Sequence, residues 1–152
     1  MNISAKADYA ICAAVALAAD DGDAPVKGEA LARSQDIPTK FLENIMGDLR
    51  KAGIVSSQRG AVGGYWLARP ADEITLADVI RAVEGPLANV HESSPEDVSY
   101  PGAAEPLKEI WIAVRASLRA VLERVTLADL ATGDLPGDVL ELARDPGARL
   151  TR

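Results

Sequence analysis

The sequence contains few residues that could form a reactive centre: one cysteine (Cys12), one histidine (His91) and only 4% aromatic residues. A single cysteine excludes a disulfide within the chain and any multi-cysteine metal cage built by one subunit. One histidine and one cysteine do not provide a nucleophile, a base and an orienting group together. We therefore do not expect an enzyme.

Long hydrophobic runs are also missing. The longest apolar stretch, residues 9–19, is alanine-rich and far shorter than the roughly 20 residues that cross a membrane. No segment resembles an export signal, so we expect a cytoplasmic protein without membrane contact. The 152 residues, 48% of them apolar, are enough for one compact domain and an extra element.

Helical spacing of apolar residues predicts three helices in the first third of the chain. Ser4 caps the first, which ends at the acidic turn 20–23, and the second covers residues 27–34. A turn at 35–37 leads to a third helix, over residues 38–53. Two helices separated by a short turn are typical of a helix-turn-helix. In the third helix we expect these apolar residues to be buried: Phe41, Leu42, Ile45, Met46, Leu49 and Ala52.

A glycine-rich turn with Arg59 at its tip follows the third helix. The β-branched and aromatic residues on either side predict strands at 54–57 and 65–68. A hairpin directly after a helix-turn-helix is typical of a winged domain. We expect positive φ angles at Gly60, Gly63 and Gly64.

A winged helix-turn-helix makes duplex DNA the first partner to consider, because its helix fits the major groove and Arg59 can enter the minor groove. The opposite side of the third helix also carries Gly47 and Lys51. Lysine and asparagine donate to guanine and adenine edges, glutamate accepts from cytosine, and hydroxyls contact phosphates. The predicted DNA-binding residues are Thr39, Lys40, Glu43, Asn44, Ser57, Arg59 and Gly60. The alternative is a solvated helix face and an ordinary charged turn.

The formal net charge of −7 requires the charges to be located before DNA is accepted as a partner. Residues 1–70 carry 8 Lys+Arg and 8 Asp+Glu, whereas residues 71–152 carry 8 and 15, which gives the total of −7. The acidic excess therefore lies in the second half, after residue 70.

Two sequences of the same kind predict capped helices in the second half. Thr75 with Asp78, and Thr126 with Asp129, each match a capping box. We interpret them as the same capping chemistry used twice, since a spacing of 51 residues without other similarity does not indicate a repeat.

A long helix is predicted over residues 105–126, after a loop from 85 to 104. Its broad apolar face can pack on a partner helix and on its own domain. A tail follows, and we expect residues 145–152 to be mobile. The apolar residues recur at 4-3-4-3-4 spacing: Leu107, Trp111, Val114, Leu118, Val121 and Val125.

The predicted fold is thus mainly α with a small β wing: a winged helix-turn-helix followed by a long C-terminal dimerisation helix. We divide the chain into a DNA-binding domain (1–85), a loop (86–104), the dimerisation helix with a short following helix (105–132) and a C-terminal tail (133–152).

Several segments together resemble the bacterial IscR/NsrR/CymR-type regulators, the Rrf-two family. They occur in the family's order and spacing, and the likeness covers about residues 1–132. The resemblance implies a homodimeric transcription factor, which we expect to be a repressor, with long helices that cross and a palindromic DNA site. The segments are Ser4–Ala10, Pro38–Leu42, Leu49–Val55, Arg59–Gly60, Gly63–Tyr65, Ile74–Leu76 and Val83–Gly85.

Many members of this family hold an iron-sulfur cluster on three cysteines of the loop that here covers residues 85–104. That loop has no cysteine, so we expect no cofactor and a member without a cluster. The alternative is a metal or cluster site from Asp8, Cys12 and His91, the first two being one helical turn apart. A lone cysteine in an apolar helix is otherwise a small core residue, and a lone loop histidine is solvated.

Two further hypotheses concern other partners. An unknown small-molecule or protein effector can bind an apolar pocket between the fourth helix, with Val79, Ile80 and Val83, and the long helix. Alternatively, the chain is a protein-interaction module on a winged scaffold, whose acidic second half contacts a basic partner.

Overall fold

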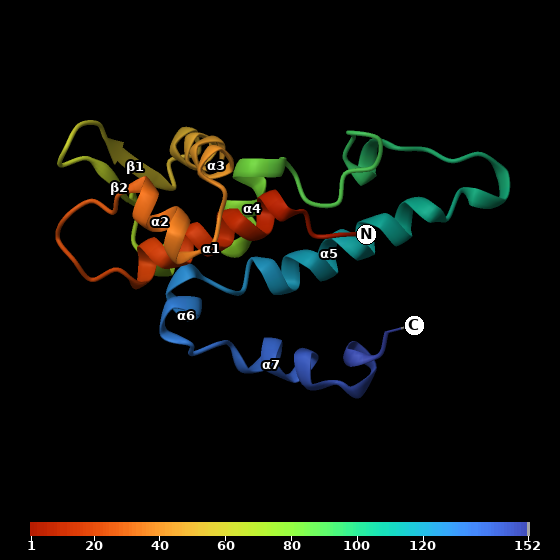
Figure 1. Ribbon diagram of the computed structural model, residues 1–152. Coiled ribbons are helices and arrows are strands. Elements are labelled where there is room, and N and C mark those ends of the chain that lie inside the picture. Colours follow the sequence, from red (N-terminus) through yellow and green to blue (C-terminus); the bar gives the residue numbers. More distant parts are fainter. Residues whose placement is uncertain (152) are drawn as a thin grey trace.

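The computed structural model describes residues 1–151 and is mainly helical with one two-stranded sheet, as predicted (Figure 1). Short 3-10 helices lie at Ala71–Glu73, Pro95–Asp97, Gly102–Ala104 and Pro146–Arg149. The helices and strands are α1 (Ala5–Ala19), α2 (Gly28–Ser34), α3 (Thr39–Lys51), β1 (Val55–Gln58), β2 (Gly64–Leu67), α4 (Leu76–Glu84), α5 (Leu107–Leu122), α6 (Leu127–Thr132) and α7 (Gly137–Arg144).

Helix α1 is the centre of the core, and α3, α4 and α6 pack around it. The Ser4 hydroxyl caps α1 by accepting a 3.0 Å hydrogen bond from the Ala7 amide, as predicted. Most of its buried residues are alanines, which let neighbouring helices approach closely and give up little side-chain entropy on folding. The buried residues of α1 are Ala7, Ala10, Ala13, Ala14 and Leu17.

Helices α2 and α3 form the predicted helix-turn-helix. The turn between them places Asp36 at a φ of 52°, a left-handed conformation that aspartate tolerates. Four of the six expected apolar residues of α3 are buried: Leu42, Ile45, Met46 and Leu49. The prediction was wrong for Ala52 and for Phe41, which is 39% exposed. Phe41 lies at the rim of the core, where its ring meets the edge of Tyr9 at 5.5 Å between centroids.

The wing is an antiparallel hairpin in which Ser57 pairs with Tyr65 and Gln58 with Gly64. Val26 extends it by exchanging two backbone hydrogen bonds with Tyr65, of 2.8 and 2.9 Å. Positive φ occurs at Gly60 (102°) and Gly64 (152°), but not at Gly63. Gly63 is required for another reason: a Cβ there would lie 2.2 Å from the Gln58 carbonyl oxygen.

Both predicted capping boxes form, and they lie against each other. The Leu76 amide donates to the Val125 carbonyl at 3.0 Å, and the Leu127 amide donates to the Ile74 carbonyl at 2.9 Å. We call this backbone pairing of residues 74–76 with 125–127 the junction. It explains why α5 ends at Leu122 rather than continuing to Thr126 as expected: Val125 is buried in the core, and Thr126 caps α6.

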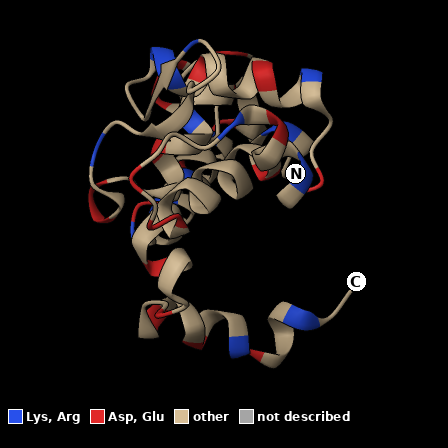
Figure 2. Cartoon of the chain, turned by 60° about the vertical axis from the view of Figure 1, so that its left-hand side comes forward, with Lys and Arg blue, Asp and Glu red and all other residues tan. Residues whose placement is uncertain are grey.

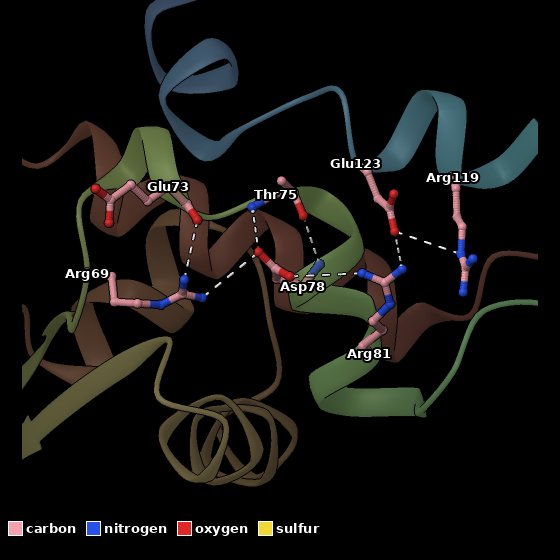
Figure 3. Close-up of polar contacts among 7 residues, drawn as sticks. All are labelled: Arg69, Glu73, Thr75, Asp78, Arg81, Arg119 and Glu123. Carbon is pink, nitrogen blue, oxygen red and sulfur yellow. Dashed lines mark hydrogen bonds and ion pairs between the residues drawn. The ribbon is translucent and has the colours of Figure 1, made fainter. Parts of the chain in front are cut away.

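Ion pairs surround the junction (Figure 3). Asp78 lies 3.9 Å from Arg69 and 4.0 Å from Arg81, and Arg81 also pairs with Glu123 of the segment after α5. These groups are all at least one-third exposed, so each pair contributes little to stability. The backbone bonds therefore fix the position of α5 more strongly than the charges do.

The second half differs from expectation in two places. The 85–104 loop contains two of the 3-10 helices, and Arg115 of α5 holds the first by hydrogen bonds to Ser94 (3.0 Å) and Glu96. The predicted tail contains α7, which packs mainly against the turn that follows it. Arg152, at the end of the predicted tail, lies outside the described residues.

Candidate nucleic-acid interface

A groove of about 530 Å³ lies between α3, the start of α2 and the wing. Five of the seven predicted DNA-binding residues line it: Thr39, Glu43, Ser57, Arg59 and Gly60. They come from α3 and from the hairpin, which the chain connects through only three residues, 52–54. The order of a helix followed by a hairpin therefore brings both elements to one surface.

Lys40 and Asn44, the other two predicted residues, do not line this groove. Both are exposed on α3, on the side away from its buried residues. At 3.6 residues per turn they lie about 100° and 140° around the helix from Thr39. The polar surface of α3 thus extends beyond the groove. Lys40 and Asn44 lie on the part of that surface outside the groove.

Arg59 is exposed at the tip of the hairpin. Its place depends on the glycines after it: Gly60 turns the chain at positive φ, and its carbonyl accepts a 3.0 Å hydrogen bond from the Gly63 amide. Gly64 approaches Val26 so closely that a Cβ would lie 2.5 Å from the Val26 carbonyl oxygen. The short hairpin therefore has a closely packed base that fixes where the arginine projects.

Sequence analysis missed several residues of the groove. Arg50, at the end of α3, donates a 3.4 Å hydrogen bond to the Ser57 hydroxyl and so links the helix to the wing. The groove is also lined by Lys27, Gln58 and Tyr65. The sequence shows that Arg50 and Lys27 are basic residues of the predicted helix-turn-helix. It does not show that they face the groove, because that depends on the orientation of the hairpin.

Basic and acidic residues are interspersed along the chain (Figure 2). Around the groove the charges are Lys27, Arg50 and Arg59 against Glu29 and Glu43. Lys6 of α1 pairs with Asp48 of α3 at 2.7 Å, which partly neutralises a carboxylate of the recognition helix. The groove is therefore mildly electropositive although the whole chain is acidic, and this permits contact with phosphates.

The structure does not bring Asp8, Cys12 and His91 together in one chain. Among residues 1–151, no three His, Cys, Asp or Glu side chains form a group that could hold a metal ion. His91 is exposed in the loop at a φ of 49°, and Cys12 lies half-buried on α1. Burial, and then the nearby charge of Asp8, raise the pKa of the Cys12 thiol. Both effects disfavour the thiolate, which is the form that binds metals.

The groove and the order of elements can now be compared with known proteins. The profile of the Rrf2 family, described as an iron-dependent transcriptional regulator, matches residues 3–133. This chain belongs to the Rrf2 family. A Mycobacterium tuberculosis protein named provisionally as an HTH-type transcriptional regulator is 48% identical over 145 residues, which are 95% of this chain and 90% of that protein.

Solved Rrf2 structures have the same fold. The structure of CymR, the global cysteine regulator of Bacillus subtilis, has a TM-score of 0.72 at 36% identity and covers 88% of this chain and 98% of CymR. IscR of T. potens has a TM-score of 0.68 at 32% identity and covers 100% of this chain and 93% of IscR. The resemblance noted from the sequence is thereby confirmed.

The Rrf2 relatives are named as transcriptional regulators, which confirms that this chain is a DNA-binding regulator with a winged-helix fold and not an enzyme. None of the helices in residues 1–151 is long and apolar enough to span a lipid bilayer.

The donor set does not fit the iron cluster that many Rrf2 proteins hold. Thiolates are the usual protein ligands of such clusters, and the 85–104 segment contains none. The first 3-10 helix of that segment is instead held by Arg115, a cation that is 9% exposed and would repel a metal ion. The segment is thus fastened to α5 by hydrogen bonds of its own side chains.

Proposed function

We propose that this Rrf2 protein acts in the cytoplasm as a homodimeric repressor that binds a palindromic operator without an iron-sulfur cluster. The proposal depends on one observation above all: the outer face of α3 and the arginine-tipped wing share one groove. A helix in the major groove with Arg59 in the adjacent minor groove is the binding mode that this surface supports.

Dimerisation is supported by the unpaired apolar face of α5. A hollow of about 450 Å³ runs along that helix, lined by Ile110, Ala113, Val114, Ser117, Leu118, Val121 and Leu122. Ile110 is 56% exposed in a single chain, and contiguous exposed apolar side chains are typical of a protein interface. A two-fold dimer would present two α3 helices to two half-sites, so the operator should be palindromic.

For repression, it is enough that the dimer occupies its operator. A dimer bound over a promoter covers the grooves that the polymerase must reach, and release of the dimer restores access. Because the cysteine-free loop does not fit a cluster, we propose that something other than an iron-sulfur cluster controls DNA affinity.

The test is a mobility-shift titration with genomic fragments selected for binding by the wild-type protein. Binding should weaken as salt increases, because contact with phosphates releases counterions. Arg59→Ala should weaken specific binding by about tenfold or more. Arg119→Ala is the matched control, since it removes the same charge from an exposed position of α5 that lines neither the groove nor the hollow.

Affinity that is indifferent to both salt and Arg59→Ala would contradict the proposed binding mode and favour the protein-interaction module. Anaerobic purification tests the cofactor separately: we expect a colourless protein without iron, and a visible absorption band with bound iron would overturn the cluster-free proposal.

A further inference from the structure

The C-terminal arm, residues 134–151, has apolar side chains that its own chain does not cover. Leu142 is 60% exposed and Leu150 is 58% exposed. The arm lies beyond residues 3–133, which are the residues that the family profile matches. An amphipathic helix of eight residues is too short to be stable in water by itself and needs a surface to pack on.

The base of the arm is held in place. Leu135, Val139 and Leu140 are half-buried, and Asp138 pairs with Arg124, just after α5, at 3.4 Å from Nε to Oδ2. The far end, by contrast, is exposed throughout residues 141–151. The start of α7 is therefore anchored near the end of α5, while the rest of the arm projects.

The arm lies on the side of α5 that carries Ile110, at one edge of the apolar hollow. Arg115 faces the 85–104 loop, and Ile110, five residues earlier, lies about 140° around the helix from it. Ile110 thus points away from the loop, whereas Leu118 and Leu122, at the other edge of the hollow, lie about 60° and 20° from Arg115. Figure 1 shows the 85–104 loop above α5 and the arm with α7 below it.

We propose that the C-terminal arm packs across α5 of a second copy of this chain, so that each subunit of the dimer is clasped by its partner. This deepens the proposed function, because it assumes that the α5 faces pair. A partner helix seated in the hollow of α5 lies between that helix and α7, where it can cover Ile110 on one side and Leu142 on the other. Two-fold symmetry makes the contact reciprocal, and each arm adds to the interface.

Contact between the arm and α5 of the same chain does not cover these apolar side chains. In the single chain Ile110 and Leu142 remain 56% and 60% exposed. A second α5 supplies an apolar surface of matching chemistry, since it is the same row of residues.

The test asks which chain the arm touches. Two full-length proteins are made with Cys12→Ser, one carrying Leu142→Cys and the other Ile110→Cys, and they are mixed, allowed to exchange subunits and treated with a short bis-maleimide. We expect a covalent dimer that contains one chain of each kind. A third protein with both cysteines should then form cross-links between chains rather than within one.

Asp72→Cys in place of Ile110→Cys is the control, because Asp72 is exposed on the winged domain. It should give no covalent dimer with Leu142→Cys. Cross-links confined to single chains, or no cross-link in a protein that sediments as a dimer, would overturn the arm contact while leaving the proposed dimer intact. Sedimentation as a monomer would overturn both.

A second measurement gives the arm's contribution to the dimer. Leu142→Asp should raise the dimer dissociation constant by about tenfold or more, because it places a charge in an apolar contact. Glu141→Gln, the adjacent and exposed position, should leave that constant unchanged within about twofold. An unchanged constant in Leu142→Asp would contradict the proposal.

Discussion

The winged half and the C-terminal half differ in where their apolar side chains are covered. In the part of the chain that the structure describes, nearly all buried apolar residues belong to residues 7–87, and those beyond them are Pro95 of the loop and Val125 and Leu127 of the junction. Among residues 1–151, α5 and α7 contain no fully buried apolar side chain. The winged half therefore buries its apolar side chains within one chain, whereas the C-terminal half leaves apolar side chains exposed.

The largest effect that tests this difference should come from the core of the winged half. Leu49 of α3 is fully buried, so Leu49→Ala should lower the free energy of unfolding by about 2–5 kcal/mol through lost burial and the cavity left behind. Urea unfolding monitored by circular dichroism measures the loss. Leu142→Ala in α7 is the comparison, and in a monomeric background it should cost less than about 0.5 kcal/mol.

If both leucine variants destabilised the single chain equally, the arm would be part of one continuous core, and the contrast between the halves would fail.

A charge introduced into α5 should change the free energy of unfolding less than Leu49→Ala does, but it should weaken dimer formation strongly. Leu118→Glu places a carboxylate in the apolar hollow, and the dimer dissociation constant should rise by about 100-fold or more. Operator binding should fall with it, since each half-site depends on the other. Analytical ultracentrifugation and a mobility shift on the same samples report both.

Ala116→Glu is the matched control for Leu118→Glu, because it adds the same charge at an exposed position that does not line the hollow. A Leu118→Glu protein that stays dimeric would show that another surface joins the subunits.

Elements with strong local signals could be predicted from the sequence. Ser4, Thr75 and Thr126 each cap the helix that was expected, because a capping interaction involves residues only three positions apart. The buried side of α3 follows from helical periodicity in the same way, and its outer side gave two of the groove residues, Thr39 and Glu43.

Features that depend on packing between distant segments could not be predicted. Val125 fits the apolar repeat of a helix, yet it is buried at the junction, where its carbonyl accepts a hydrogen bond from the Leu76 amide. Phe41 has the right spacing for the core but lies at its rim. Helix α7 was overlooked because it is short and follows a segment with Gly133, Pro136 and Gly137, which is typical of a tail.

The junction connects the two halves, so its caps should show a moderate and coupled effect. Thr75→Ala and Thr126→Ala each remove an N-cap and should each destabilise the protein by about 1 kcal/mol. Because the two caps lie on paired backbone segments, the double variant should depart from the sum by about 0.5 kcal/mol or more. Thr132→Ala, at the exposed end of α6, is the control and should cost less than about 0.5 kcal/mol. If the losses of unfolding free energy measured in urea were additive, the two caps would stabilise the protein independently of each other.

The smallest expected effect concerns Cys12, the single thiol of the winged half. Burial and the charge of Asp8 raise the pKa of this thiol in the folded chain, so the folded state favours the protonated form. The resulting stabilisation is fully present below the unfolded pKa of roughly 8.5 and is lost as the pH rises through the higher folded value. Stability of the wild type should therefore decline more steeply above pH 8.5 than that of Cys12→Ser. Alkylation by iodoacetamide should likewise reach half its maximal rate at a higher pH in the folded protein than in urea, and the reverse order would show that Cys12 is an activated thiol open to redox chemistry.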